Sequence, residues 1–234
     1  MLMKKLVISG DSLSMPRPKE GILYEDTFPA LLQEHMVPEW RVINRSRRAN
    51  NSRKQAMYLN LCDDIHDYKP DVFIYHIGIV DCAPRLFSEF QQKLLERLPI
   101  SVRQKIIGYF SRRRLYMTKR FPKVFVKPED FKKYSQKVIL TAKKYASAIY
   151  IIGIIMPSDK ILKRSFGYRE NVLGYNELLK EVSNETGAEF IDLVNMLDPK
   201  EDFLEDGYHL VKSGNRKIYE VLFERICNTK LKPD

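Results

Sequence analysis

Short runs of β-branched residues alternate with segments of helical periodicity along most of the chain, and this alternation limits the possible folds more than any other feature. The runs that predict strands are residues 5–9, 41–43, 71–77, 148–156 and 188–194. Between them, apolar residues recur at the spacing of one helix face. Because a helix between two strands returns the chain for parallel pairing, the sequence predicts an α/β fold with a five-stranded parallel sheet and helices on both faces.

The length and composition predict a single domain over residues 1–234. Hydrophobic residues make up 44% of the chain, which is enough for a sizeable core, and no repeat or low-complexity linker divides it. Cys62, Cys82 and Cys227 have neither CxxC nor metal-ligand spacing, so we expect reduced thiols and no metal site. No apolar run reaches the ~20 residues of a membrane-spanning helix, and the first residues do not resemble a signal peptide. We therefore expect a cytoplasmic protein.

One long segment interrupts the alternation of strands and helices. About seventy residues separate the third predicted strand from the fourth, far more than one crossover requires. Residues 82–128 contain twelve Lys or Arg and two Glu, a net charge of +10, which equals the net charge of the whole chain. Aromatic residues are interleaved with these charges. We predict that residues 82–146 form a basic helical insertion or lid beside the ligand-binding edge of the sheet.

The excess of positive charge predicts an anionic partner. The candidates are a phosphorylated or acidic glycan, a lipid-linked sugar at a membrane surface that the basic insertion contacts, and nucleic acid. The alternative is a solvated helix face without a ligand. Nucleic acid is disfavoured because no recognised binding module is present. The basic residues Arg45, Arg47, Arg48, Arg53 and Lys54 follow the second predicted strand, so we expect them near the edge where parallel sheets bind ligands, which favours an anionic substrate.

Two short motifs place reactive side chains at this edge. Gly10-Asp11-Ser12 follows the first predicted strand, and a serine on such a turn exposes its hydroxyl and its backbone N–H. Asp206 precedes His209 by three residues, just before the last helical pattern. A carboxylate in this position can hydrogen-bond one imidazole nitrogen and leave the other facing a serine. We therefore predict Ser12 as nucleophile, His209 as general base and Asp206 as the residue that orients it, whereas Asp11 braces the turn.

The order of the motifs resembles that of the GDSL-type (SGNH) hydrolases. Residues 5–12 resemble the opening block of this family, residues 42–46 the strand into its second block, residues 78–81 its third block and residues 206–215 its closing block. Gly78 opens the third block and is expected to form part of an active-site turn. The resemblance covers the chain apart from the basic insertion. It implies a three-layer, flavodoxin-like fold and hydrolysis of an ester, usually a carboxylic ester, without a metal or organic cofactor.

Two positions depart from the family pattern. The family holds the oxyanion with a glycine backbone N–H in the second block and an asparagine side chain in the third, and these positions are Ala49 and Val80 here. Alanine keeps the N–H, but valine has no donor, and loss of one oxyanion donor typically lowers turnover by ~10²–10³. We expect the N–H groups of Ser12 and Ala49 to remain as donors. The candidate replacement donors are Arg48, Asn50, Asn51 and Arg85.

These features leave three possible functions. The first is a serine esterase or deacylase that acts on O-acyl groups of a carbohydrate or another anionic polar substrate. The second is an acyltransferase on the same scaffold that serves surface-polysaccharide synthesis. The third is a non-catalytic binding protein that retains the fold, as Val80 and Ala49 suggest.

Overall fold

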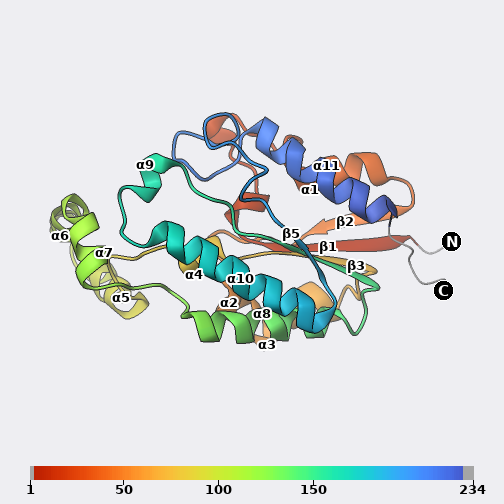
Figure 1. Ribbon diagram of the computed structural model, residues 1–234, viewed down its shortest axis with the longest axis horizontal. Helices are drawn as coiled ribbons and strands as arrows, with labels where there is room; N and C mark the ends of the chain where they lie inside the picture. The colour runs from red at the N-terminus through yellow and green to blue at the C-terminus, as the bar shows by residue number, and fades with distance from the viewer. Residues whose placement is uncertain (1–2, 229–234) are drawn as a thin grey trace.

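The computed structural model describes residues 3–228 and contains a five-stranded sheet at its centre (Figure 1). The strands are β1 (Lys4–Gly10), β2 (Trp40–Asn44), β3 (Val72–His76), β4 (Ala148–Ile152) and β5 (Glu189–Ile191). Their order is β2-β1-β3-β4-β5, and every neighbouring pair is parallel, which confirms the predicted sheet. The direction of winding reverses between β1 and β3, and ligands of such sheets bind at the carboxyl ends of the strands at this point.

Helices cover both faces of the sheet, so the fold has the three layers that the resemblance implies (Figure 1). On one face lie α1 (Phe28–Met36) and α11 (Lys212–Asn228). On the other lie α2 (Ser52–Gln55), α3 (Tyr58–Leu61), α4 (Ile79–Cys82), α8 (Pro128–Ala142) and α10 (Tyr168–Thr186). The short elements are η1 (Ser12–Ser14), η2 (Pro18–Glu20), the π-helix η3 (Cys62–His66) and α9 (Asp159–Leu162). None of the helices within residues 3–228 is both long and apolar enough to cross a bilayer.

The pattern of burial explains why the central strands have almost continuously apolar sequences. All residues of β3 are buried, because helices cover this strand on both faces. The helices above and below need only one apolar stripe each. In α8 this stripe includes Phe131, Val138 and Ile139, and in α10 it includes Val172 and Leu179, all fully buried.

The fourth apolar run is longer than the strand that it forms. β4 ends at Ile152, whereas the run continues to Met156, and both Ile154 and Met156 are buried. The reason lies in Asn176 of α10, whose side-chain amide accepts from the Ile154 backbone N–H (2.7 Å) and donates to the Ile154 carbonyl (2.9 Å). A side chain therefore satisfies the backbone groups that a longer β5 would have paired.

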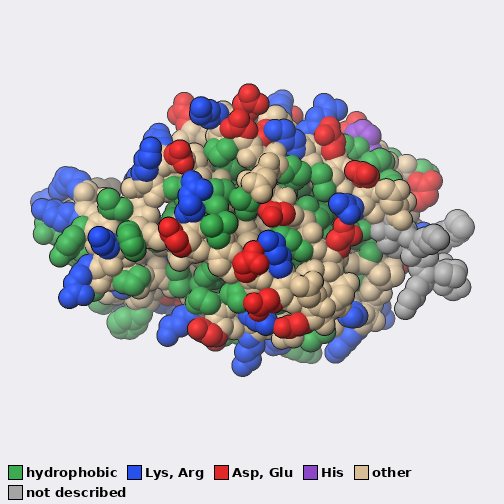
Figure 2. All heavy atoms as spheres, in the orientation of Figure 1, with side chains coloured by type: hydrophobic (Ala, Val, Ile, Leu, Met, Phe, Trp, Pro, Cys, Tyr) green, Lys and Arg blue, Asp and Glu red, His purple; other side chains and the backbone are tan. Residues whose placement is uncertain are grey.

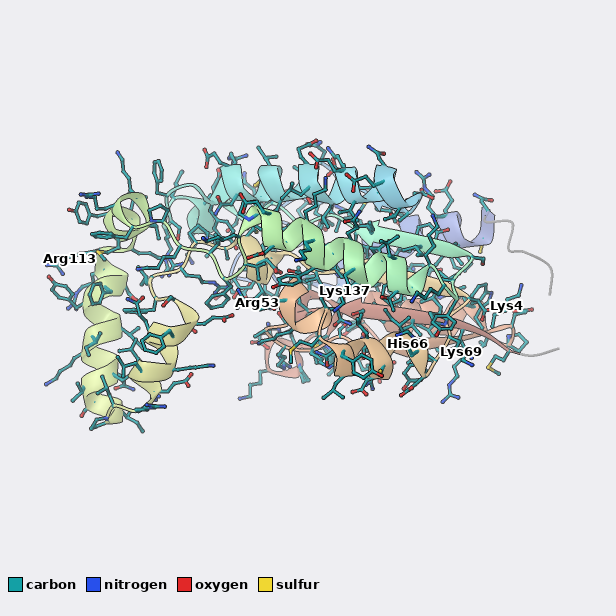
Figure 3. All side chains as sticks on the ribbon, turned by 90° about the horizontal axis from the view of Figure 1, so that it is seen from below. Lys4, Arg53, His66, Lys69, Arg113 and Lys137 are labelled. Carbon is teal, nitrogen blue, oxygen red and sulfur yellow. The ribbon has the colours of Figure 1, made fainter. Side chains whose placement is uncertain are left out.

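The segment between β3 and β4 has two parts. The helices α5 (Glu89–Glu96), α6 (Ile100–Arg112) and α7 (Arg114–Arg120) form an arm at one end of the molecule, away from the sheet (Figures 1 and 3). No residue of α5 or α6 is buried. Figure 2 shows basic and apolar side chains together on this arm. In contrast, α8 packs against α10 and covers the sheet, so this part of the segment 82–146 belongs to the body of the fold.

Glycine is required in the turns that follow β1 and β3. A Cβ on Gly10 would lie 2.7 Å from the hydroxyls of Ser14 and Ser46. Gly78 has a φ of +153°, and a Cβ there would lie 2.5 Å from the Ile154 side chain. Both turns are therefore closely packed against the segments that surround the ligand-binding edge.

We predict that Gly78→Ala lowers the free energy of unfolding by about 2–4 kcal/mol, because the methyl group meets Ile154 and the backbone conformation disfavours a side chain. The control is Gly174→Ala in α10, where a Cβ meets nothing within 4 Å and the better helix propensity should raise stability by up to about 1 kcal/mol. Chemical denaturation measures both values. Equal stabilities of Gly78→Ala and the unchanged protein would contradict the described packing of this turn.

Candidate active site

Ser12 is the first residue of η1, directly after β1. Asp11 caps this short helix: its side chain accepts a hydrogen bond from the Leu13 backbone N–H (2.9 Å), and its own N–H donates to the His76 carbonyl (3.2 Å). Asp11 is only 1% exposed, and burial raises its pKa to about 7. The turn therefore holds the Asp11 side chain inward, while Ser12 lines a cleft.

His209 and Asp206 lie in the loop that precedes α11. The Oγ of Ser12 lies 3.0 Å from Nε2 of His209, and Nδ1 of His209 lies 2.5 Å from Oδ2 of Asp206. The other carboxylate oxygen of Asp206 accepts from the backbone N–H groups of His209 (3.0 Å) and Tyr208 (3.2 Å). The structure therefore brings the predicted nucleophile, base and orienting carboxylate into one hydrogen-bonded chain.

The protonation states follow from these contacts. Burial would raise the pKa of Asp206, but the hydrogen bonds from His209 and Tyr208 outweigh it and hold the pKa below its usual value. Burial also lowers the pKa of His209, and the positive charge of Arg17 lowers it further, although Asp206 acts in the opposite direction. At neutral pH the imidazole is therefore neutral. Its Nδ1–H donates to Asp206, so the lone pair on Nε2 faces Ser12.

Arg17 is a site residue that the sequence analysis did not identify. Its Nη2 contacts Nε2 of His209, the nitrogen that also faces Ser12. An antiparallel bridge between Arg17 and Ile22 holds this loop. No motif surrounds Arg17, and only the tertiary structure brings it to the imidazole.

The cleft at these residues has a volume of about 440 Å³. Its walls come from η1, the loop after β2, the segment after β3, the arm, the segment from α9 to α10 and the loop before α11. The charged side chains that line it, apart from His209, are Arg17, Arg48, Arg85, Arg114 and Arg164. Among the described residues, no Asp or Glu lines the cleft. Within residues 3–228, no cluster of three or more His, Cys, Asp or Glu has an arrangement that could hold a metal ion.

Ser12 and Ala49 line the cleft, and neither of their backbone N–H groups has a hydrogen-bond partner among the described residues. Ala49 has a φ of +53°, so it adopts the left-handed conformation that usually favours glycine. The residue type has changed at this position, but the backbone conformation remains one that suits glycine. Both N–H groups are therefore available to a substrate oxygen.

The four candidate replacement donors differ in their positions. The Asn50 amide donates both its N–H groups within the protein, to the Gly10 carbonyl (3.1 Å) and the Gln55 side chain (2.9 Å). The Asn51 side chain caps α2 by accepting from Lys54 N–H. Neither asparagine lines the cleft, whereas Arg48 and Arg85 do.

Arg85 lies beside the position where the family has its asparagine. Val80 lines the cleft, and one nitrogen of the Arg85 guanidinium donates to the Val80 carbonyl (2.8 Å). The guanidinium lies 4.0 Å from the centre of the Phe125 ring, and burial lowers its pKa. Its Nε has no partner among the described residues.

Most of the basic residues that follow β2 do not reach the cleft, in contrast to the sequence-based expectation. Arg45 and Arg47 pair with the fully buried Asp64, at 3.1 and 2.6 Å, and Arg53 pairs with Glu89 at 2.8 Å. The ion pairs with Asp64 and Glu89 hold these basic side chains outside the cleft that Ser12 lines. Of this group, only Arg48 lines the cleft.

A second serine–histidine pair is buried close to the first. The hydroxyl of Ser14 lies 2.8 Å from Nδ1 of His76, and neither residue lines the cleft. Burial lowers the pKa of His76 to about 4, so its imidazole is neutral, and its Nε2 has no partner among the described residues. No carboxylate within residues 3–228 hydrogen-bonds to this imidazole. The pair connects the turn after β1 to the end of β3.

Asp81 connects the third sequence block to the second. Its Oδ1 accepts from the backbone N–H (2.9 Å) and the hydroxyl (2.6 Å) of Ser52, whereas its Oδ2 has no partner among the described residues. Burial raises the pKa of Asp81 to about 7, although the bonds from Ser52 oppose the shift. Through Ser52, this carboxyl fixes the loop that carries Ala49. In the sequence, the only sign that Asp81 supports the site is its position in the block at residues 78–81.

We predict that Asp81→Asn gains stability relative to the unchanged protein as the pH rises from about 4 to 7. In this range the unfolded chain releases the Asp81 proton, at a pKa near 3.8, whereas the folded protein retains it up to about 7. The contribution of Asp81 to the free energy of unfolding therefore falls as the pH rises, whereas the contribution of the amide in Asp81→Asn stays constant. Chemical denaturation at several pH values measures the difference, with the exposed Asp67→Asn as control. A constant difference for Asp81→Asn would show that the folded protein does not retain this proton.

Comparisons with known proteins agree with this architecture. Residues 9–217 match the family described as GDSL-like Lipase/Acylhydrolase. Among solved structures, an α/β-hydrolase enzyme from the metagenome of Lake Arreo in Spain is 19% identical, with a TM-score of 0.64 and coverage of 94% of each chain. An acetylxylan esterase from Geobacillus stearothermophilus is 17% identical, with a TM-score of 0.63 and coverage of 99% of this chain and 97% of the esterase.

A third similar structure is an esterase from Pseudoalteromonas sp. inhibited by monoethylphosphonate, which is 14% identical, with a TM-score of 0.57 and coverage of 96% of this chain and 97% of the esterase. At these identities the structural likenesses show a shared fold. A search among curated proteins found no match. Because the family match spans nearly the whole chain, the protein belongs to the GDSL-like lipase/acylhydrolase family and is a hydrolase of ester bonds.

Proposed function

We propose that this hydrolase is a serine esterase or deacylase in which Ser12 is the nucleophile, His209 the general base and Asp206 the residue that orients and stabilises the imidazole. The observation that carries this proposal is the unbroken hydrogen-bonded chain from Ser12 through His209 to Asp206 at the wall of the cleft. A neutral imidazole between a serine hydroxyl and an ionised carboxylate can take the serine proton.

The reaction begins when Ser12 Oγ attacks the acyl carbon and its proton passes to Nε2 of His209. Because Nη2 of Arg17 contacts the same nitrogen, Arg17 moves away before this transfer. The imidazolium, stabilised by Asp206, then gives the proton to the leaving alcohol. A water molecule loses a proton to His209 and attacks the acyl-serine, which releases the acid and restores Ser12.

The backbone N–H groups of Ser12 and Ala49 are the proposed donors to the oxyanion. Both line the cleft and lack partners among the described residues. Val80 offers no side-chain donor. Arg85 is anchored on the Val80 carbonyl, so its positive charge lies beside the missing amide and can stabilise negative charge that develops on the substrate.

The substrate that we favour is an O-acyl group on a carbohydrate or another anionic polar molecule. The arginine-lined cleft without acidic residues supports an anionic substrate. An acyltransferase would use the same steps with a hydroxyl group in place of water, so it differs only in its product. A cytoplasmic location and contact between the arm and an anionic membrane surface stay predictions.

We predict that a fluorophosphonate probe labels the unchanged protein, and that Ser12→Ala and His209→Ala abolish the labelling. The probe reacts only with an activated serine and does not require the natural substrate. The matched control is Ser14→Ala, because Ser14 belongs to the buried pair with His76 and does not line the cleft. Labelling is measured by gel fluorescence, and circular dichroism establishes that each variant is folded.

The outcomes separate the alternatives. Labelling that is lost in Ser14→Ala and kept in Ser12→Ala would assign the nucleophile to the buried pair. No labelling of the folded, unchanged protein would favour a binding protein that retains the fold. Where labelling occurs, analysis of products from an acetyl ester with and without an added sugar acceptor distinguishes hydrolysis from acyl transfer.

We also predict that kcat/KM rises with pH and that the midpoint of this rise lies below 6.5, because the pKa of His209 is lowered and only the neutral imidazole accepts the serine proton. Arg17→Gln removes a positive charge and should move the midpoint to higher pH. Asp206→Asn removes the opposing negative charge, so it should move the midpoint to lower pH and lower kcat by as much as about 10⁴.

The measurement is the initial rate of ester hydrolysis across the acidic range. Arg53→Gln is the control, since this arginine pairs with Glu89 outside the cleft, and its midpoint should stay unchanged. Identical midpoints for Arg17→Gln and the unchanged protein would contradict the electrostatic effect of Arg17 on His209.

A further inference from the structure

The positive charge in the cleft has no negative counterpart. Of the residues that the structure describes, five arginines and no acid line the cleft. None of the five forms an ion pair with an acidic residue in the described part of the chain, whereas Arg45 and Arg47 nearby share the buried Asp64. The protein thus neutralises arginines a short distance from the cleft and leaves those in the cleft without partners of opposite charge.

Neutral groups hold two of the cleft arginines in place. Arg114 donates to the Ser165 hydroxyl and the Pro84 carbonyl, both at 2.6 Å, and Arg85 donates to the Val80 carbonyl at 2.8 Å. Carbonyl and hydroxyl oxygens fix the direction of a guanidinium but do not cancel its charge. Both side chains are therefore pre-positioned and remain able to bind an anion.

The charges also repel one another in a partly desolvated site. Burial lowers the pKa of Arg114, and the positive charges of Arg164 and Arg85 lower it further. A bound anion would relieve this repulsion, and its attraction to the arginines is strengthened by the low local dielectric. Arg164 is exposed, and its side chain forms no hydrogen bond or ion pair with the described residues.

The position of these arginines favours a substrate that extends away from Ser12. Arg85 and Arg114 line both the cleft and a second cavity of about 400 Å³, whose other walls come from the arm and the segment that leads into it. The wall of this second cavity includes the apolar Leu86, Phe87 and Ile107 and one acidic residue, Glu96. The arginines therefore lie where the cleft continues toward the arm.

We propose that Arg85, Arg114 and Arg164 form a subsite for a phosphate group that the ester substrate itself carries. This inference rests on the proposed function of Ser12. One carboxylate can pair with two guanidinium groups, as Asp64 does with Arg45 and Arg47, and would leave the third arginine of the subsite unmatched. A phosphate presents more oxygens and up to two negative charges. The phosphate anchors the molecule in the subsite, and its acyl group reaches Ser12.

The test compares esters that differ only in charge. Acetate release is measured from monoacetylated glucose, from the same ester with a 6-phosphate or a 6-sulfate, and from monoacetylated glucuronate. The phosphorylated ester should have a kcat/KM at least about tenfold above that of the neutral ester, mainly through a lower KM. Added inorganic phosphate should inhibit competitively, and high salt should reduce the preference.

The variants locate the subsite. Arg164→Gln and Arg114→Gln should remove most of the preference for the phosphorylated ester and leave hydrolysis of the neutral ester within about twofold. Arg164→Gln carries the most weight, because its side chain has no bonds whose loss could unfold the protein. The matched control is Arg113→Gln: Arg113 is adjacent to Arg114 but lies on the outer side of the arm, over the Tyr109 ring (Figure 3).

The outcomes distinguish failure of this inference from failure of the proposed function. Hydrolysis that depends on Ser12 but shows no preference for the phosphorylated ester would overturn the subsite and leave the esterase intact. An equal gain for the glucuronate ester would overturn the assignment to phosphate. If no ester is hydrolysed and no serine is labelled, calorimetry with glucose 6-phosphate decides: binding that is lost in Arg164→Gln supports the subsite, and no binding to the unchanged protein overturns it.

Discussion

The hydrogen bond between Ser12 and His209 joins side chains 197 positions apart, and the geometry of the whole site depends on it. Ser12 is fixed because it follows β1, the strand that pairs with both β2 and β3. His209 is fixed from the other end of the chain. In the middle of the same loop, the buried Asp202 accepts a hydrogen bond from the Lys217 ammonium of α11 at 2.6 Å. Since α11 packs against α1 over the sheet, one hydrogen bond depends on the packing of an entire layer.

The predictable part of the structure is the part that local sequence patterns determine. Apolar runs predict all five strands, and Gly10-Asp11-Ser12 and Asp206 to His209 lie at strand or loop ends that parallel topology brings to one edge. The length of the fourth strand is not predictable in this way, because the Asn176 side chain replaces the strand partner of Ile154. Periodicity identifies a buried run, but it does not identify the group that satisfies its backbone.

Charged side chains are harder to place from sequence than apolar runs. Arg45 and Arg47 follow a strand that ends at the correct edge, yet the buried Asp64 draws them away from the cleft. Arg114 and Arg164 line the cleft although they come from the arm and from the segment before α10. Their positions depend on how these segments pack on the body, and an ion pair depends on which acid lies within reach. Neither condition leaves a local pattern in the sequence.

Ala49 and Val80, the two positions that depart from the family's oxyanion pattern, are best interpreted together with Arg85. Alanine in the left-handed region costs about 1–2 kcal/mol, and such a conformation persists only where the surrounding structure enforces it. Here the enforcement comes from Asn50, bonded to the Gly10 carbonyl, and from Ser52, bonded to the buried Asp81. The protein thus keeps the Ala49 N–H in the cleft at a cost in stability. In the proposed mechanism, Arg85 places a positive charge beside Val80, so the absence of an amide there removes one donor but leaves a cationic group next to the proposed oxyanion position.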